Sequence, residues 1–350
     1  MSGEQLRPFE FPSVKAILSL LVAHSYRWRR VSFGSFFWFQ PMHLPHTFIA
    51  PILESVEVFG GYNDERDHIF YRSLLRGCPA LRSYTSNRRG LYELPPDYIP
   101  WEQLRNLEIA DPINVANALM LLGRAVNLHS CYLTITPDYI RTHSLKPVTS
   151  PIKILTIDAA NSWQTGEDVK QFFLFLDARN LTNLSVTFLL RQYTTHDILS
   201  DILSKPRLRL SSLTIRNLAI SEDKFLDCLT LLSESITALE ILRDSEEEPI
   251  YGVVKNKIIN LLTFHGEGSP KPLFPLLETL TLELCVEADD GLLTHMVRSR
   301  RRSPDTLRDH GIALLKRLDV VFVHSTHSLD EEGLKEMYEE GLRGGVKFFR

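Results

Sequence analysis

Apolar residues recur along the chain in a six-residue pattern, L-x-x-L-x-L, in which other apolar residues also occupy the leucine positions. The last two apolar positions are two residues apart, so their side chains point to the same face of a short strand. The pattern occurs ten times: Leu53-Val56-Val58, Leu81-Tyr84-Ser86, Leu104-Leu107-Ile109, Leu128-Cys131-Leu133, Ile152-Leu155-Ile157, Leu181-Leu184-Val186, Leu210-Leu213-Ile215, Ile236-Leu239-Ile241, Leu277-Leu280-Leu282 and Leu315-Leu318-Val320. Each copy predicts one short strand, and only the second copy is degenerate.

The segments between these copies have the apolar spacing of amphipathic helices. Helical stripes of this kind are Val169-Phe172-Phe173-Leu176, Ile198-Ile202-Leu203 and Phe225-Leu229-Leu232. The first positions of successive copies lie 23 to 41 residues apart, and most of these intervals are close to the 20 to 29 residue period of leucine-rich repeats. A unit of one strand and one helix does not cover its own apolar face, so the units must stack and share a core.

We therefore expect an α/β solenoid of the leucine-rich-repeat type, a horseshoe of about ten to eleven irregular strand-helix repeats with a parallel sheet on its concave side. Residues 1–350 are predicted to form this single domain. Within it we expect a helix over residues 13–24, repeats over residues 26–323, and a C-terminal capping helix and tail over residues 328–350. Trp28-Val31-Phe33 is the candidate eleventh copy. Ser328 and Glu331 have the spacing of a capping box at the start of the last helix.

Composition and charge restrict the classes of partner. The chain has 350 residues, 44% of them hydrophobic, and a formal net charge of −4. This charge disfavours nucleic acid, since proteins that bind phosphate backbones normally carry a positive field. The apolar run over residues 16–23 is shorter than the roughly 20 residues of a membrane span, so no membrane association is expected. The four cysteines are widely separated, which indicates a reducing compartment, the cytoplasm or the nucleus.

Common catalytic and cofactor signatures are absent from the sequence. It contains no H-E-x-x-H, C-x-x-C, G-x-x-x-x-G-K-[ST], G-x-G-x-x-G or G-x-S-x-G. The twelve histidines show no ligand spacing on a shared face, and each cysteine occupies or adjoins an apolar position. The sequence therefore predicts a protein that is not an enzyme and that has no catalytic residue, cofactor or metal site.

Two charged runs are candidate interaction segments. Four arginines lie together near the C-terminal end of a predicted helix: Arg298, Arg300, Arg301 and Arg302. A localisation signal, a phosphate-binding patch and a loop controlled by phosphorylation at Ser303 are all open interpretations. The favoured interpretation is the solvated end of a helix, where positive charges suit the helix dipole. The acidic run over residues 244–248 is expected to form an exposed loop.

Residues between and after the paired apolar positions are expected on the concave face of the sheet. The residues between them are Glu57, Thr85, Glu108, Tyr132, Thr156, Ser185, Thr214, Glu240, Thr281 and Asp319. The candidate partner-binding residues of this face are Phe59, Glu108, Tyr132, Asp158, Arg216, Glu240, Leu242 and Glu283. The mildly acidic surface favours a basic or polar protein or peptide, with Phe59, Tyr132 and Leu242 as anchors. Alternatively, the face is solvated and the loops make the contacts.

Several segments resemble the leucine-rich-repeat region of fungal F-box domain-containing proteins. The similarity is carried by AILSLLVAHSYRWRRVSF, FIAPILESVEV, IPWEQLRNLEI, RLSSLTIRNL, FPLLETLTLEL and HMVRSRRRSPDTLRDHGIALLKRLDVVFV, within residues 13–345. The resemblance implies the substrate-binding repeats of a ubiquitin-ligase receptor. An F-box is not evident in residues 1–12, so the Skp adaptor and cullin are expected partners only where an F-box precedes the repeats. The alternative is a free-standing leucine-rich-repeat scaffold or remnant with no link to a ligase.

A third class, GTPase activators built from regular leucine-rich repeats, is disfavoured. Those repeats usually follow each strand with an asparagine that contributes to a buried ladder. In this chain, no copy has an asparagine eight residues after its first apolar position.

Overall fold

The computed structural model describes residues 12–34, 49–59, 74–87, 99–136, 145–159, 165–188, 195–205, 208–218, 220–232, 234–243, 252–322 and 327–348. In these residues twelve parallel strands form one sheet, in which the strands follow one another in chain order. They are β1 (Arg30–Phe33), β2 (Ser55–Phe59), β3 (Ser83–Asn87), β4 (Asn106–Ile113), β5 (Ser130–Ile135), β7 (Ile154–Ala159), β9 (Asn183–Thr187), β10 (Ser212–Arg216), β11 (Ala238–Leu242), β12 (Thr279–Glu283), β13 (Arg317–Phe322) and β14 (Arg343–Phe348).

Helices alternate with these strands. They are α1 (Pro12–Ala23), α3 (Val115–Arg124), α4 (Thr165–Phe175), α5 (Thr195–Leu203), α6 (Glu222–Thr230), α7 (Asn256–Leu262), α8 (Leu292–Ser299), α9 (Pro304–Asp309), α10 (Ser328–Glu339) and the 3-10 helices η1 (Ser25–Arg27) and η2 (Trp101–Gln103). None of the helices in the described ranges is long and apolar enough to cross a membrane. A parallel sheet with interleaved helices confirms the predicted α/β solenoid of leucine-rich-repeat type.

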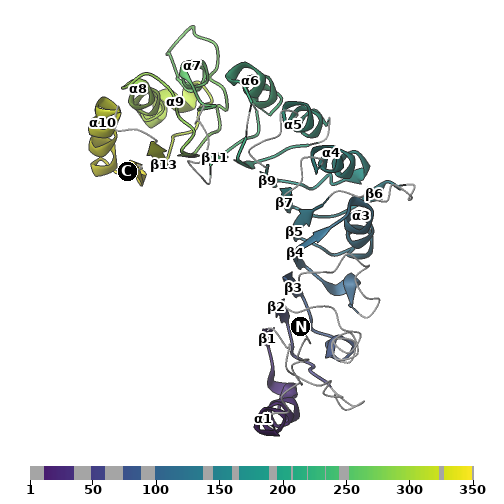
Figure 1. The fold of residues 1–350 in the computed structure, drawn as a ribbon. Helices are drawn as coiled ribbons and strands as arrows, with labels where there is room; N and C mark the ends of the chain where they lie inside the picture. The colour runs from purple at the N-terminus through teal and green to yellow at the C-terminus, as the bar shows by residue number, and fades with distance from the viewer. Residues whose placement is uncertain are drawn as a thin grey trace, which may run out of the picture. The chain divides into compact units, whose positions relative to one another are not determined.

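The elements group into two compact units. The first unit, residues 1–152 and 175–178, contains β1 to β5, α1 and α3. It also contains a two-stranded parallel sheet, in which β6 (Val148–Thr149) pairs with β8 (Leu176–Asp177) and lies against α3. The second unit, residues 153–174 and 179–350, contains β7 and β9 to β14, and its helices lie along one side of its strands (Figure 1).

The predicted strand register is confirmed. Every apolar position of the ten copies is at most 7% exposed. Equivalent positions pair directly, so that Leu184 in β9 lies between Leu155 in β7 and Leu213 in β10. The eleventh copy is confirmed as well, because β1 pairs with β2 in the same register. All residues of the three predicted helical stripes are at most 5% exposed, although the last residue of the first stripe lies in β8.

A buried polar pair accommodates the degenerate second copy. Ser86 is 0% exposed, and its Oγ donates a hydrogen bond to Asp111 Oδ2 at 2.9 Å. Asp111 lies in a bulge of β4, because Ile109 pairs with β5 in the regular register but the next pair joins Pro112 to Thr134. A regular strand would pair Ala110 with Thr134, but the bulge inserts extra residues, and Thr134 pairs with Pro112 instead.

The twelfth strand, β14, lies where the sequence predicted a tail. The apolar pattern does not detect it because Gly344 and Gly345 occupy strand positions that carry side chains in the other copies. Gly344 pairs with Leu318 and has a φ of +113°. A Cβ atom at this position would lie 1.9 Å from the Leu318 carbonyl oxygen. The last strand therefore approaches β13 in a way that only glycine permits.

Candidate functional site

In-register rows of polar side chains form the sheet surface that carries the candidate partner-binding residues. In the second unit one row runs from β7 to β13: Thr156, Ser185, Thr214, Glu240, Thr281 and Asp319. The next row includes Asp158, Thr187 and Arg216. All of these residues are partly exposed, whereas the strand residues between the two rows are buried. Neighbouring strands are about 4.8 Å apart, so the rows form one continuous polar surface, which we call the strand face.

The charges of the strand face partly cancel. Thr214 Oγ1 donates a hydrogen bond to Glu240 Oε2 at 3.0 Å. Arg317 Nε donates to Asp319 Oδ2 at 2.6 Å, and this bond, with attraction from Asp319 and Glu240, raises the pKa of Arg317. The sequence pattern did not include Arg317 among the residues of the concave face. It considered only the positions between and after the paired apolar residues, and Arg317 precedes both. The strand face therefore carries charges of both signs, with carboxylates in excess.

The candidate anchors differ in exposure. In the first unit Phe59 is 38% exposed, Glu108 is exposed and Tyr132 is partly exposed. Leu242 is only 5% exposed, so the expectation that it is an exposed anchor is corrected. The chain turns at this level of the sheet: Asn217 has a φ of +57° and donates its backbone N–H to the Leu242 carbonyl at 2.9 Å. The alternation of buried and exposed residues ends there.

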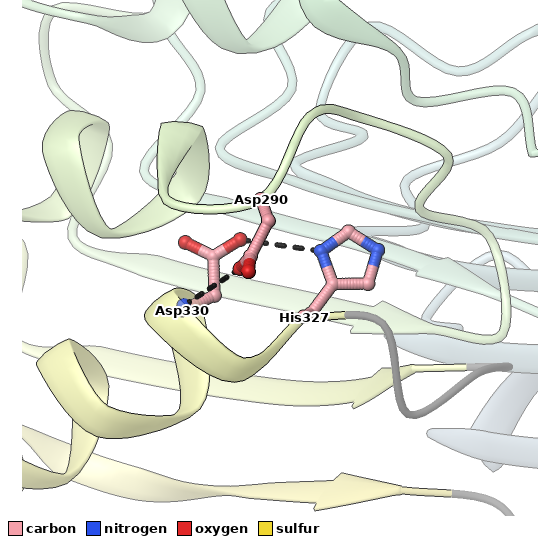
Figure 2. Close-up of side chains that lie close together, drawn as sticks. All are labelled: Asp290, His327 and Asp330. Carbon is pink, nitrogen blue, oxygen red and sulfur yellow. Dashed lines mark hydrogen bonds and ion pairs between the residues drawn. The ribbon is translucent and has the colours of Figure 1, made fainter.

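A second group of polar residues lies at the start of α10. Figure 2 shows Asp290 from the loop before α8 beside His327 and Asp330. Within the described part of the chain this is the group whose histidine and carboxylate atoms lie close enough to share a metal ion, all within 4.8 Å. His327 Nδ1 lies 3.3 Å from Asp330 Oδ2, and the His327 ring stacks on Phe322 with 4.3 Å between the ring centroids.

Backbone amides use both carboxylates of this group. Asp290 accepts hydrogen bonds from the N–H groups of Leu329 and Asp330, each at 3.0 Å. Asp330 accepts one from the N–H of Thr294 in α8 at 2.7 Å. The first turns of α8 and α10 are thus capped reciprocally, each by a carboxylate from the other repeat. These bonds assign the group a structural role.

The capping box predicted from Ser328 and Glu331 is wrong. His327 occupies the N-cap position without a side-chain cap bond, and Glu331 instead accepts a hydrogen bond from Lys335 Nζ at 2.5 Å. Asp290 takes over the capping, although it lies 39 residues before Leu329 in the sequence. Motif spacing does not detect a cap supplied from a different repeat.

Replacing Asp290 with alanine is expected to lower the free energy of unfolding by about 1 to 2 kcal/mol, as loss of a helix cap does. Burial by itself would raise the pKa of Asp290, but the amides of Leu329 and Asp330 lower it below 3.8 overall. The stabilisation is therefore complete above the unfolded pKa near 3.9 and is lost as the pH falls through the lower folded value. Denaturant unfolding of both proteins at pH 7 and near pH 3 measures this difference, which should shrink at acidic pH.

The control is Asp309→Ala, at an exposed position at the end of α9. We expect its unfolding free energy to stay within about 0.5 kcal/mol of the parent value. Equal effects of the two substitutions, or a difference for Asp290→Ala that grows towards acidic pH, would contradict the capping role.

The arginine run has structural contacts, and its interpretation as a solvated helix end is wrong for Arg300. This residue is 0% exposed. Its Nε donates to the Leu262 carbonyl at 2.6 Å, Nη1 to that of Phe274 at 3.0 Å and Nη2 to that of Leu273 at 2.6 Å. Burial lowers the pKa of Arg300 to about 10, so the guanidinium stays protonated at neutral pH.

The other three arginines of the run are also engaged. Their partners are Glu336 for Arg298 (3.4 Å), the Leu315 carbonyl for Arg301 (3.0 Å) and the Phe264 ring for Arg302 (5.8 Å to the centroid). The run therefore presents fewer free charges to a partner than its sequence indicates. The acidic run over residues 244–248 lies outside the described residues.

No protein-family model matches this chain, and no curated protein is significantly similar to it. The assignment to a leucine-rich-repeat-like solenoid rests on strand order, register and burial.

The four cysteines are core residues. All four are buried. Burial raises the pKa of Cys78 to about 12 and also raises the pKa values of Cys131 and Cys285. These three thiols remain protonated at neutral pH, which is typical of small apolar core residues and not of catalytic thiolates.

Proposed function

We propose that the chain is a non-catalytic protein–protein recognition module that binds a segment of its partner on the strand face. The observation that carries this proposal is the row from Thr156 to Asp319, in which partly exposed polar side chains stand in register on six neighbouring strands. The helices of this unit lie along the other side of the strands (Figure 1). An extended segment lying across the row meets hydroxyl and carboxylate groups at regular intervals.

The side chains of the strand face favour a polar partner with some basic groups. Asp158, Glu240 and Glu283 supply carboxylates, and Arg216 supplies a positive charge among them. Complementary charge steers and orients a partner more than it raises affinity, so we assign these residues to specificity. In the first unit, the exposed ring of Phe59 is the best-placed apolar anchor.

We further propose that these repeats are the substrate-binding region of an F-box ubiquitin-ligase receptor. The proposal rests on the loose resemblance in style and order, set out in the sequence analysis, between the repeat segments and fungal F-box domain-containing proteins. The alternative is a free-standing scaffold that binds the same client without a ligase. The two differ in whether the Skp adaptor and cullin accompany the client.

Site-specific photo-crosslinking in native cells tests the binding surface. Benzoylphenylalanine is introduced at Thr187 or at Thr281 on the strand face, and at Leu174 as the control, because Leu174 is 68% exposed on α4. We expect the same client to be cross-linked from both strand positions and not from Leu174. Equal cross-linking from Leu174, or none from the strand positions, would overturn the proposal.

The same captures distinguish the two forms of the proposal. Co-purification of the Skp adaptor with the client supports the receptor, and a client without the adaptor supports the scaffold. If neither a client nor the adaptor is recovered, both forms are rejected.

A further inference from the structure

The first unit contains a pocket of about 1380 Å³, which lies where α3 ends and where β4 and β5 begin. Small-molecule sites usually measure roughly 300 to 1,000 Å³, so this pocket has room for an organic molecule. Two side-chain hydrogen bonds hold its walls. Gln103 Nε2 donates to the Cys78 carbonyl at 2.8 Å, and Asn127 Nδ2 donates to the Glu102 carbonyl at 2.7 Å.

Basic residues are stacked along one wall of this pocket. Arg82, Arg105 and His129 occupy equivalent positions, each one residue before a strand. The N–H of Arg105 donates to the Arg82 carbonyl, and the N–H of His129 to the Arg105 carbonyl, both at 2.8 Å, so the three residues lie on successive rungs of the sheet. Arg124 also lines the pocket, so the lining residues that the structure describes include three arginines and one carboxylate, that of Glu102. Guanidinium groups bind phosphate and carboxylate strongly, often through two parallel hydrogen bonds.

Trp101 forms part of the pocket wall beside these basic residues. Its side chain lines the pocket, is only 5% exposed, and its Nε1 is buried without a hydrogen-bond partner in the described residues. A buried indole N–H usually has an acceptor, so this donor calls for an explanation. Because Nε1 has almost no exposed surface, a ligand oxygen in the pocket reaches it only if the wall rearranges, and Trp101 serves here as a reporter of binding.

We propose that this pocket binds a small organic anion, a molecule with a phosphate or carboxylate group on an apolar body. The anionic group binds Arg105, with Arg82 and His129 on the neighbouring rungs. The apolar body lies against Ile99, Pro100 and Val126. The side chain of Val126 is 55% exposed, and the bound molecule would shield it from water. This site is separate from the strand face and does not depend on the function proposed for it.

Phenyl phosphate tests the proposal by nuclear magnetic resonance. In the full chain labelled with ¹⁵N at its four tryptophans, the Trp101 indole resonance is identified as the one missing from Trp101→Phe. We expect phenyl phosphate to shift this resonance with saturation, and the neutral benzyl alcohol at the same concentration to leave it in place. Phenylacetate, titrated in parallel, shows which anionic group is preferred. No saturable shift with either anion overturns the proposal.

Calorimetry provides a readout that does not depend on resonance assignment. Arg105→Gln should weaken phenyl phosphate binding by roughly 5- to 20-fold, because one charge-assisted contact is lost. The matched control is Lys316→Gln, at the equivalent position before β13 in the second unit, and it should bind as the parent does. Equal weakening in the control contradicts the location of the site. Inorganic phosphate that binds as tightly as phenyl phosphate contradicts the apolar part of the proposal.

Discussion

Replacement of Arg300 by methionine is expected to lower the free energy of unfolding by about 3 to 5 kcal/mol, the largest effect that we predict for a single side chain. Methionine fills a similar length of the core but donates no hydrogen bond. The carbonyls of Leu262, Leu273 and Phe274 would then lose the guanidinium that binds them in a buried position. Guanidinium-chloride unfolding followed by circular dichroism measures the change.

The same experiment has two comparison variants. Arg300→Lys keeps the charge but not the planar fork of donors, so we expect an intermediate loss. Arg302→Met removes an exposed arginine from the same run and should change the unfolding free energy by less than about 0.5 kcal/mol. If Arg300→Met is no more destabilising than Arg302→Met, the buried role of Arg300 is wrong.

Truncation of Leu184 to alanine should lower the free energy of unfolding by about 2 to 5 kcal/mol, the range for buried leucines in close-packed cores. Leu184 is 2% exposed at the centre of β9 and is paired with Leu155 and Leu213 on the neighbouring strands. The substitution opens a cavity between two repeats, so their mutual stabilisation is weakened as well. Thermal and denaturant melts report the loss.

The neighbouring residue in the same strand supplies the control. Ser185 lies on the strand face and is partly exposed. The unfolding free energy of Ser185→Ala should therefore stay within about 0.5 kcal/mol of the parent value. A melt of Leu184→Ala that matches the melt of Ser185→Ala would show that the strand register is inverted, because a shift of one residue exchanges the two faces.

The strand face of the second unit was largely predictable from the sequence. Side chains alternate between the two sides of a strand, so the spacing of Leu184 and Val186 already places Ser185 on the opposite face. This logic placed Leu242 wrongly, because this last residue of β11 is buried although it pairs in register with the partly exposed Arg216. It also missed β14, because Gly344 carries no side chain to reveal the pattern.

The sequence by itself determined the repeat, its strands and the apolar stripes of its helices, because each depends on spacing within a few residues. Only the tertiary structure decided the caps of α8 and α10, the burial of Arg300 and the pocket beside Trp101. Asp290 lies 39 residues before Leu329, and Arg300 lies 38 residues from Leu262. These contacts join different repeats, and irregular repeat lengths leave no fixed spacing for a motif to show. Stacking brings such residues together, so their chemistry becomes visible only when the repeats are packed.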